Sequence, residues 1–121
     1  MNLSSILDQA LNIKGVISAA VVSGEGFIVE EASNSDQDLG FVGGIIASGL
    51  ASSNVLAELL GGGNISQMMI EYEEGPVLMI PLETKDEDYV VLTTIDSISN
   101  LGRARFQLRK LLPNIVETIN A

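Results

Sequence analysis

The stretch LGFVGGIIASGLASSNVLA, residues 39–57, contains no charged residue and is rich in glycine, alanine and serine. Its length and composition predict one long helix that is poorly suited to contact with water. The glycines at 61–63 are predicted to end this helix, because glycine adopts the left-handed conformation at a helix C′ position without strain. Asp36 and Asp38 precede the stretch and are predicted to suit the helix N-terminus, where exposed N–H groups and the dipole favour negative charge.

Two lines of apolar side chains run along different faces of this predicted helix. The first line is Leu39, Val42, Ile46, Leu56 and Leu60, and the second is Phe41, Ile45, Val55 and Leu59. A helix at the surface of a soluble domain normally has one apolar stripe. A chain of 121 residues can cover one side of the helix with its own sheet, so the other side is expected to need a second protein surface.

A transmembrane span is the competing interpretation of the same stretch, since about 18 or more uncharged residues are the usual signal. The glycines, the serines and Asn54 lower its hydrophobicity, and its flanks are acidic where a span usually carries Lys or Arg on the cytoplasmic side. The N-terminal sequence MNLSSILDQALNIK lacks the basic region and the cleavage site of a signal peptide. We therefore expect a cytoplasmic protein without a membrane-inserted segment.

The composition excludes several classes of function. Hydrophobic residues make up 46% of the chain, which is typical of one globular domain over residues 1–121. A net charge of −10 makes nucleic acid an unfavourable partner. The chain has no Cys and no His, so disulfides, thiolate chemistry, the commonest general base and the commonest transition-metal ligand are missing. We expect no catalytic residue, no cofactor and no metal, and therefore no enzyme.

Glycines and charged runs offer few alternatives to that expectation. There is no G-x-x-x-x-G-K-[ST] phosphate loop, and Gly24-Glu25-Gly26 is interpreted as a hairpin turn. The acidic runs lack the spacing of an EF-hand and are interpreted as solvated loops; they are Glu71, Glu73 and Glu74, and Asp86, Glu87 and Asp88. The last predicted helix carries Arg103, Arg105, Arg109 and Lys110. These cations are interpreted as a solvated face, the alternatives being an acidic partner, acidic neighbours within a dimer, or an arginine finger from Arg103 or Arg105.

The periodicity of apolar residues predicts the order helix, two strands, helix, three strands, helix. The first helix is predicted at 3–13, and it is followed by strands at 16–22 and 27–31. After the long helix, strands are predicted at 64–73, 77–82 and 89–95. The last helix is predicted to begin at Ser97 or Ser99, and Pro113 is predicted to kink or restart it. In 64–73, the even positions Ser66, Met68, Ile70 and Tyr72 are predicted to face the core, and the odd positions Gln67, Met69, Glu71 and Glu73 are predicted to face outward.

Short connections between these elements predict an α/β (α+β) sandwich built on a five-stranded antiparallel sheet. The first and last helices are amphipathic and are predicted to share one face of the sheet. The long helix is predicted to lie alone on the other face. Pro81 is expected near a strand end or a bulge, because it has no N–H for the ladder.

The order of elements, the hairpin AAVVSGEGFIVE (residues 19–30) and the helix end VLAELLGGG (residues 55–63) resemble the Roadblock family, which includes the dynein light chain of that name and bacterial MglB-like proteins. The resemblance implies a longin- or profilin-like sandwich that forms homodimers, or heterodimers with a related chain. In such dimers the middle helices lie side by side and the third strands join the two sheets. The resemblance also implies work with Ras-like small GTPases, as a regulator or an adaptor.

A strip of small residues marks the predicted dimer interface on the long helix. Gly40 and Gly44 have the G-x-x-x-G spacing, which Ser48 and Ser52 continue, so a second helix could approach closely. The alternative is that the strip lets the helix lie close to its own sheet. The predicted interface is completed by Ile45, and by Met69 and Glu71 on an edge strand that a partner pairs with.

A less apolar line on the same helix, Ala51, Asn54 and Glu58, is the predicted surface for a further partner. The function expected is a non-catalytic, homodimeric regulator or adaptor of a Ras-like small GTPase. The alternative is a dimeric scaffold for a larger assembly, with no effect on GTP turnover.

Overall fold

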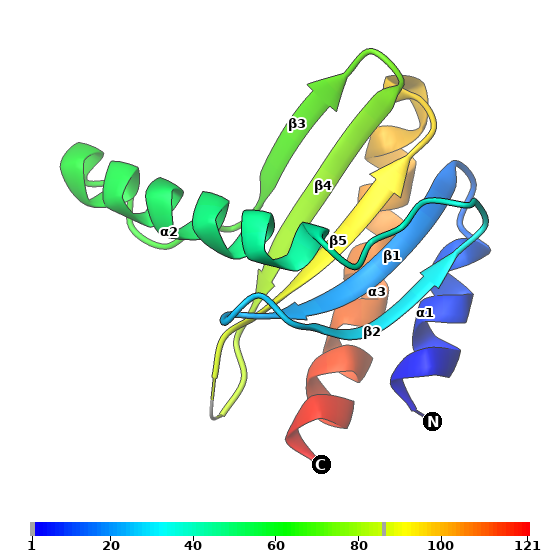
Figure 1. Ribbon diagram of the computed structural model, residues 1–121, viewed down its shortest axis with the longest axis horizontal. Coiled ribbons are helices and arrows are strands. Elements are labelled where there is room, and N and C mark those ends of the chain that lie inside the picture. The colour runs from blue at the N-terminus through cyan, green and yellow to red at the C-terminus, as the bar shows by residue number, and fades with distance from the viewer. Residues whose placement is uncertain (1, 86) are drawn as a thin grey trace.

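A five-stranded antiparallel sheet with helices on both faces forms the structure, a computed structural model that describes residues 2–85 and 87–121 (Figure 1). The elements are α1 Leu3–Leu11, β1 Val16–Ser23, β2 Ile28–Ser33, α2 Val42–Leu60, β3 Met68–Tyr72, β4 Gly75–Leu82, β5 Tyr89–Ile95, a short 3₁₀ helix Ile98–Asn100, and α3 Leu101–Asn120. The strand order across the sheet is β2-β1-β5-β4-β3. This architecture confirms the predicted α/β sandwich and its order of elements.

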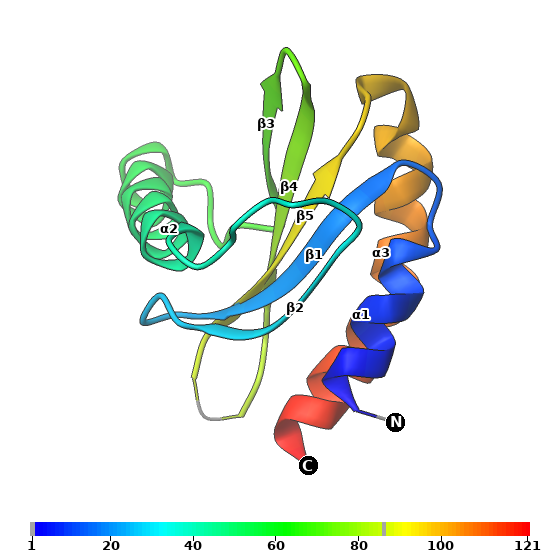
Figure 2. The same ribbon diagram turned by 45° about the vertical axis from the view of Figure 1, so that its right-hand side comes forward.

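Three layers are visible when the molecule is turned, with α2 on one side of the sheet and α1 and α3 on the other (Figure 2). The central strands β1, β4 and β5 supply side chains to two cores, because successive residues of a strand point to opposite faces. The larger core lies under α1 and α3 and includes Ile6, Leu7, Leu78, Ile95, Leu108 and Ile115. The smaller core lies under α2 and includes Val22, Leu39, Ile46, Met79, Val90 and Leu92. The predicted placement of the helices is therefore confirmed.

The start of α2 differs from the prediction. The helix begins at Val42, and Phe41 occupies the N-cap position without a side-chain hydrogen bond. Asp38 instead accepts a hydrogen bond of 2.9 Å from the backbone N–H of Gly40, which holds a turn before the helix. The prediction that Asp36 and Asp38 serve the helix N-terminus is wrong. The predicted C-terminus is confirmed, because Gly61 ends the helix in the left-handed conformation with φ of 67°.

Other boundaries shift by a few residues. The first helix ends at Leu11, before the predicted 13, and β2 begins and ends later than predicted. The third strand is limited to Met68–Tyr72. Pro81 is the penultimate residue of β4, near a strand end as expected. Of the two predicted effects of Pro113, a kink or a restart of the helix, the restart is wrong, since α3 continues without a break through this exposed position.

Candidate interaction surface

The helix α2 has little contact with the rest of its own chain. Only Gly43 and Ile46 of its residues are buried, and the helix runs across the sheet and projects beyond β3 (Figure 1). Gly43 makes the closest approach, because a Cβ at this position would collide with the backbone carbonyl of Gly26 in the β1–β2 turn. The N-terminal half of α2 is therefore held against the sheet, whereas its C-terminal half extends past the sheet edge.

The predicted strip of small residues does not pack on the sheet. Gly40, Gly44, Ser48 and Ser52 are all exposed, and a Cβ on Gly44 would meet no described atom within 4 Å. The alternative that this strip lets the helix lie close to its own sheet is wrong. The neighbouring Gly43 has that role, which the G-x-x-x-G spacing did not indicate.

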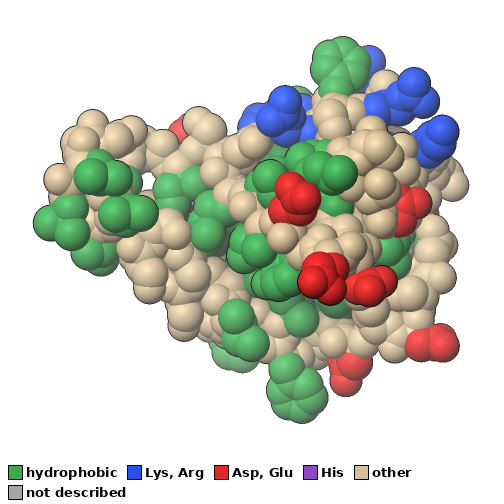
Figure 3. All heavy atoms as spheres, turned by 90° about the horizontal axis from the view of Figure 1, so that it is seen from above, with side chains coloured by type: hydrophobic (Ala, Val, Ile, Leu, Met, Phe, Trp, Pro, Cys, Tyr) green, Lys and Arg blue, Asp and Glu red, His purple; other side chains and the backbone are tan. Residues whose placement is uncertain are grey.

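Large apolar side chains cover the exposed part of α2 and continue onto β3. We call this the α2–β3 apolar surface, and it consists of Phe41, Ile45, Val55, Leu56, Leu59 and Leu60 with Met69, Ile70 and Tyr72. Ile45 is 74% exposed and Leu59 is 79% exposed. Figure 3 shows hydrophobic side chains gathered on the projecting end of α2, at the left of the view. Apolar patches of this kind on soluble chains mark interaction sites.

One line of residues along the outward face of α2 has a small half and a large half, and the exposed Ile45 lies beside the small half. Gly44 and Ser48 lie on it in the N-terminal half, and Val55 and Leu59 follow on the same face in the C-terminal half. All four residues are exposed. The predicted partner line of Ala51, Asn54 and Glu58 is also exposed and lies along one flank of this face.

An open groove of about 400 Å³ separates α2 from the sheet beside β3. Its lining is mostly apolar and includes Ile45, Ile46, Met68, Ile70, Tyr72 and Met79. The even positions of β3 thus face the α2 side of the sheet. The prediction of core positions is wrong for Ile70 and Tyr72, which are 42% and 56% exposed because α2 does not close over them. It is also wrong for Ser66, which is exposed and precedes the strand.

The strand β3 forms one edge of the sheet and pairs only with β4 among the described residues. On the side opposite α2, the Oε1 atom of Gln67 accepts a hydrogen bond of 2.9 Å from Arg109 of α3. Met69 and Glu71, the predicted interface residues of this strand, are both exposed. The five-residue ladder with β4 has a regular register, so β3 offers a straight edge for pairing.

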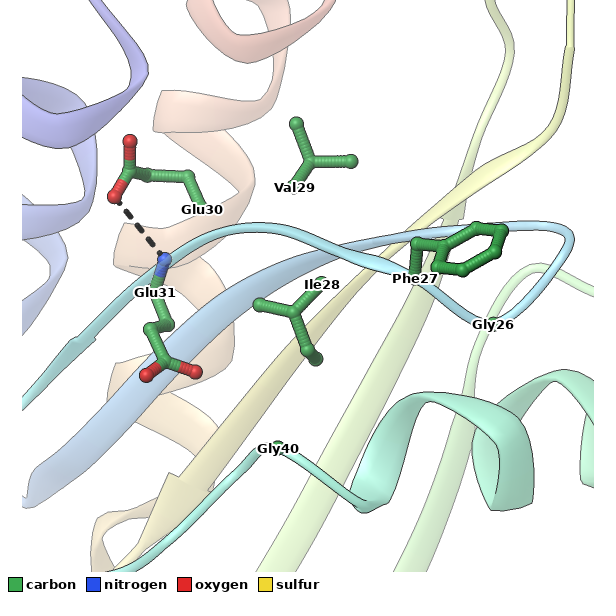
Figure 4. A pocket seen from close by; sticks show the side chains of 7 residues that line it. All are labelled: Gly26, Phe27, Ile28, Val29, Glu30, Glu31 and Gly40. Carbon is green, nitrogen blue, oxygen red and sulfur yellow. Dashed lines mark hydrogen bonds between the residues drawn. The ribbon is translucent and has the colours of Figure 1, made fainter.

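The other edge strand, β2, is less suited to pairing. Its register with β1 shifts so that Val29 has no residue opposite it, which is a β-bulge. A shallow hollow of about 430 Å³ lies here, lined by Gly26, Phe27, Ile28, Val29, Glu30, Glu31 and Gly40 (Figure 4). Val29 and Glu30 point to one side of the strand and Ile28 and Glu31 to the other, so the two carboxylates do not converge on a common point (Figure 4).

The acidic runs do not assemble into a metal site within the described part of the chain. No group of three or more Asp, Glu, His or Cys side chains there is placed to hold a metal ion. Glu87 accepts a hydrogen bond of 2.6 Å from the Tyr89 hydroxyl. Asp86, which belongs to the second predicted acidic run, lies outside the described residues.

The membrane interpretation of α2 rests on its length and composition. By these two criteria it is the one helix in residues 2–85 and 87–121 that is able to cross a membrane. The contacts of Gly43 and Ile46 with the sheet-side turn and core tie its N-terminal half to the domain.

Comparisons with known proteins identify relatives of this fold. The sequence matches the Roadblock/LC7 domain over residues 4–96. MglB of Myxococcus xanthus superimposes with a TM-score of 0.84 at 16% identity, covering 96% of this chain and 93% of that chain. The gliding protein MglB of Thermus thermophilus gives 0.79 at 16% identity, with coverage of 94% and 85%. A structure of MglB with a tetrameric arrangement gives 0.80 at 17% identity, with the same coverage. None of the curated proteins compared with the chain matches it significantly.

Proposed function

Since this chain belongs to the Roadblock/LC7 family, we propose that it is a dimeric regulator or adaptor of a Ras-like small GTPase, acting by surface contact and without a catalytic group of its own. The observation that carries the proposal is the α2–β3 apolar surface. Family membership supports a regulatory or adaptor role, and the Roadblock resemblance supports the class of partner. The dimer is a homodimer, or a heterodimer with a related chain.

The free energy of burial supports a covered α2. Burying each large apolar side chain stabilises by roughly 1.5–3 kcal/mol. Five such side chains on α2 are more than half exposed: Ile45, Val55, Leu56, Leu59 and Leu60. Their summed contribution is comparable to the whole stability of a domain, which is about 5–15 kcal/mol. A second copy of α2 is a cover of matching length and composition.

The divided outward face of α2 defines how two copies pair. A two-fold axis perpendicular to α2 runs the second helix antiparallel to the first, so the small half of one helix lies against the large half of the other. Leu59 then packs on Gly44 of the partner subunit, and Val55 packs on Ser48 of the partner subunit. In the same register Ala51 lies beside Ser52 of the partner subunit, next to the axis.

The free edge of β3 lies on the side to which α2 projects (Figure 1). Pairing of the two β3 edges joins the sheets and places Met69 and Glu71 at the junction. The projecting half of each α2 then covers the partner's sheet instead of solvent.

The flank formed by Ala51, Asn54 and Glu58 is the proposed contact for the GTPase. A symmetric dimer presents this flank twice around its axis, so one asymmetric partner that lies across the axis excludes a second. Arg103 and Arg105 lie on α3, on the opposite side of the sheet from α2 (Figure 2). An effect on GTP hydrolysis therefore comes from repositioning the GTPase's own switch residues and not from an arginine finger of this chain.

The first experiment measures mass. Light scattering behind a sizing column should give twice the chain mass at micromolar concentration without detergent. A folded monomer under these conditions contradicts the dimer, and a chain that requires detergent to stay in solution supports the membrane interpretation of α2 instead.

The second experiment measures binding to small GTPases. The dimer is incubated with each small GTPase of its source cell, loaded with GTP or GDP, and both the mass of the complex and GTP turnover are followed. We expect one GTPase to bind, and we expect Asn54→Arg, on the same flank but away from the dimer axis, to abolish binding. Gln107→Arg, which adds the same charge at an exposed position of α3, is the matched control and should leave binding unchanged.

The second candidate function is a dimeric scaffold for a larger assembly. Exposed apolar side chains outside α2 and β3 favour it, among them Phe27 on the β2 side and Phe106 on α3. A stable dimer that binds no GTPase in either nucleotide state excludes the regulator and leaves the scaffold.

A further inference from the structure

The outer face of α3 carries an aromatic ring among cations. Ala104 and Leu108 point into the core, and Phe106, between them in sequence, points away from it and is 60% exposed. Arg103, Arg109 and Lys110 lie three or four residues from Phe106 and are its neighbours on the helix surface. The ammonium nitrogen of Lys110 lies 4.5 Å from the centroid of the Phe106 ring. Together with Arg105, these residues form what we call the α3 basic patch.

This patch is positively charged, whereas the chain as a whole is negatively charged. It holds four of the six Lys and Arg residues of a protein whose net charge is −10. Figure 3 shows Lys and Arg side chains gathered around an exposed hydrophobic side chain at one edge of the view, with Asp and Glu side chains elsewhere on that face. Arg109 donates its hydrogen bond to the neutral amide of Gln67, so that bond leaves the guanidinium charge unneutralised.

The surface beside Phe106 carries no side chain at Gly102. Gly102 precedes Phe106 by one helical turn, and a Cβ there would meet no described atom within 4 Å. Ile98, one further turn away, is 46% exposed. Gly102, which lies between Ile98 and Phe106 in the sequence, thus leaves open space beside two exposed apolar side chains.

We propose that the α3 basic patch is the docking site for an acidic segment of a partner protein, one that carries an aromatic or large aliphatic side chain between its carboxylates. The apolar side chain packs on Phe106 over Gly102. The carboxylates meet Arg103, Arg109 and Lys110, whose guanidinium and ammonium groups donate charge-assisted hydrogen bonds. Charge complementarity selects this partner, because the patch is basic and the rest of the chain repels acidic segments.

A membrane surface fits this patch less well than a peptide segment does. A bilayer is flat and wide, so it also faces the Asp and Glu side chains that lie elsewhere on that face (Figure 3). Their repulsion acts over about 8 Å at physiological salt. A peptide segment is narrow enough to contact the cations alone.

The site is separate from the proposed dimer and GTPase surfaces. The helix α3 and the helix α2 lie on opposite faces of the sheet (Figure 2). Occupation of the α3 basic patch therefore leaves α2 free. The inference does not depend on whether the chain binds a GTPase.

The test uses a display library of random peptides selected on the purified chain. We expect the enriched peptides to be net acidic and to contain an aromatic or large aliphatic residue. A labelled synthetic peptide with the enriched sequence is then titrated by fluorescence anisotropy. Its affinity should fall as salt is raised, because exposed charges are screened.

Variants locate the binding site. The Kd of the peptide should rise by about tenfold or more in each of three variants, as for the anchors of other interfaces. These variants are Phe106→Ala, Lys110→Glu and Gly102→Glu. Gly102→Glu removes no side chain and enters open space, so its effect does not come from lost packing. Phe27→Ala, at a phenylalanine that is 66% exposed, and Lys14→Glu, at an exposed cation, are matched controls outside the patch and should leave the Kd unchanged.

Two results overturn the proposal. The first is a set of enriched peptides without acidic bias, or with equal affinity for wild type, Phe106→Ala and Lys110→Glu. The second is sedimentation of the wild-type chain with phosphatidylserine–phosphatidylcholine vesicles that Phe106→Ala abolishes and an acidic peptide does not compete. That second result assigns the patch to a membrane surface.

Discussion

Gly43 and Gly44 are adjacent in the sequence and have opposite surroundings. A Cβ on Gly43 would collide with the Gly26 carbonyl, whereas a Cβ on Gly44 points into open space. We predict that Gly43→Ala lowers the free energy of unfolding by about 1–3 kcal/mol, because a backbone carbonyl cannot move aside without displacing the β1–β2 turn. Urea unfolding measures the loss.

Gly102→Ala is the control for the Gly43 prediction. It also places a methyl group on a helical glycine, but in open space, so it should stabilise by up to about 1 kcal/mol through helix propensity. If Gly43→Ala is as stable as Gly102→Ala, α2 does not contact the turn as described.

Gly44 is predicted to matter for association and not for the fold of the protomer. Gly44→Leu places a large side chain where Leu59 of the partner subunit packs in the proposed dimer. We expect the dimer Kd to rise by at least about tenfold, or about 1.4 kcal/mol. Sedimentation velocity over a dilution series measures the Kd. Gly102→Leu makes the same exchange on the outer face of α3 and should leave the dimer Kd unchanged. Equal Kd values for the two variants would exclude Gly44 from the interface.

Among the elements, α2 and β3 are expected to be the ones whose protection from backbone hydrogen exchange depends on dimer formation. The projecting end of α2 packs on nothing in its own sheet, and β3 has one free edge. We predict that hydrogen exchange at residues 55–60 and 68–72 slows as protein concentration rises through the dimer Kd, since pairing closes backbone hydrogen bonds that otherwise open locally. Exchange in β1 and β5 should not change with concentration.

The edge strand β2 is the internal comparison for that measurement. It has a free edge as β3 does, but the bulge at Val29 interrupts its ladder with β1. Concentration-dependent protection of β2 in place of β3 contradicts the proposed sheet junction.

Local patterns predicted the elements that their own residues determine. Strand β5 has the predicted bounds, and Gly61 ends α2 as predicted, because an apolar run and a helix cap depend on a few neighbouring residues. The start of α2 was predicted wrongly. The side chain of Asp38 is able to accept a hydrogen bond either as a helix cap or within a turn, and the sequence alone does not distinguish the two. Burial of Ile70 was predicted wrongly because it depends on how far α2 reaches over the sheet.

The candidate surface was only partly predictable for the same reason. The absence of charge between residues 39 and 57 predicted a helix that lacks a cover. It did not indicate which glycine contacts the chain itself, since Gly43 and Gly44 differ only in the direction of the missing Cβ. Phe106 was overlooked, although its position between the core residues Ala104 and Leu108 places it on the outer face of a helix.

The molecule as a whole is predicted to bind no nucleotide tightly. It has no phosphate loop, and its net charge of −10 repels polyphosphates at long range. Titration calorimetry with GTP or ATP in the presence of magnesium should show no heat above dilution. A sub-micromolar binding isotherm with either nucleotide contradicts the interpretation of the Gly24-Glu25-Gly26 segment as a turn and of the acidic runs as solvated loops.

The division of α2 into a small half and a large half has a consequence for how paralogous pairs arise. In the proposed register, a chain with Gly44→Leu has leucine at both positions 44 and 59, so two copies of it clash. A chain with Leu59→Gly has glycine at both positions, so two copies of it leave gaps. Mixed together, each leucine faces a glycine at both contacts, so the two variants should prefer one another to themselves. After a gene duplication, one substitution in each copy is then enough to turn a self-recognising protein into two that recognise only each other.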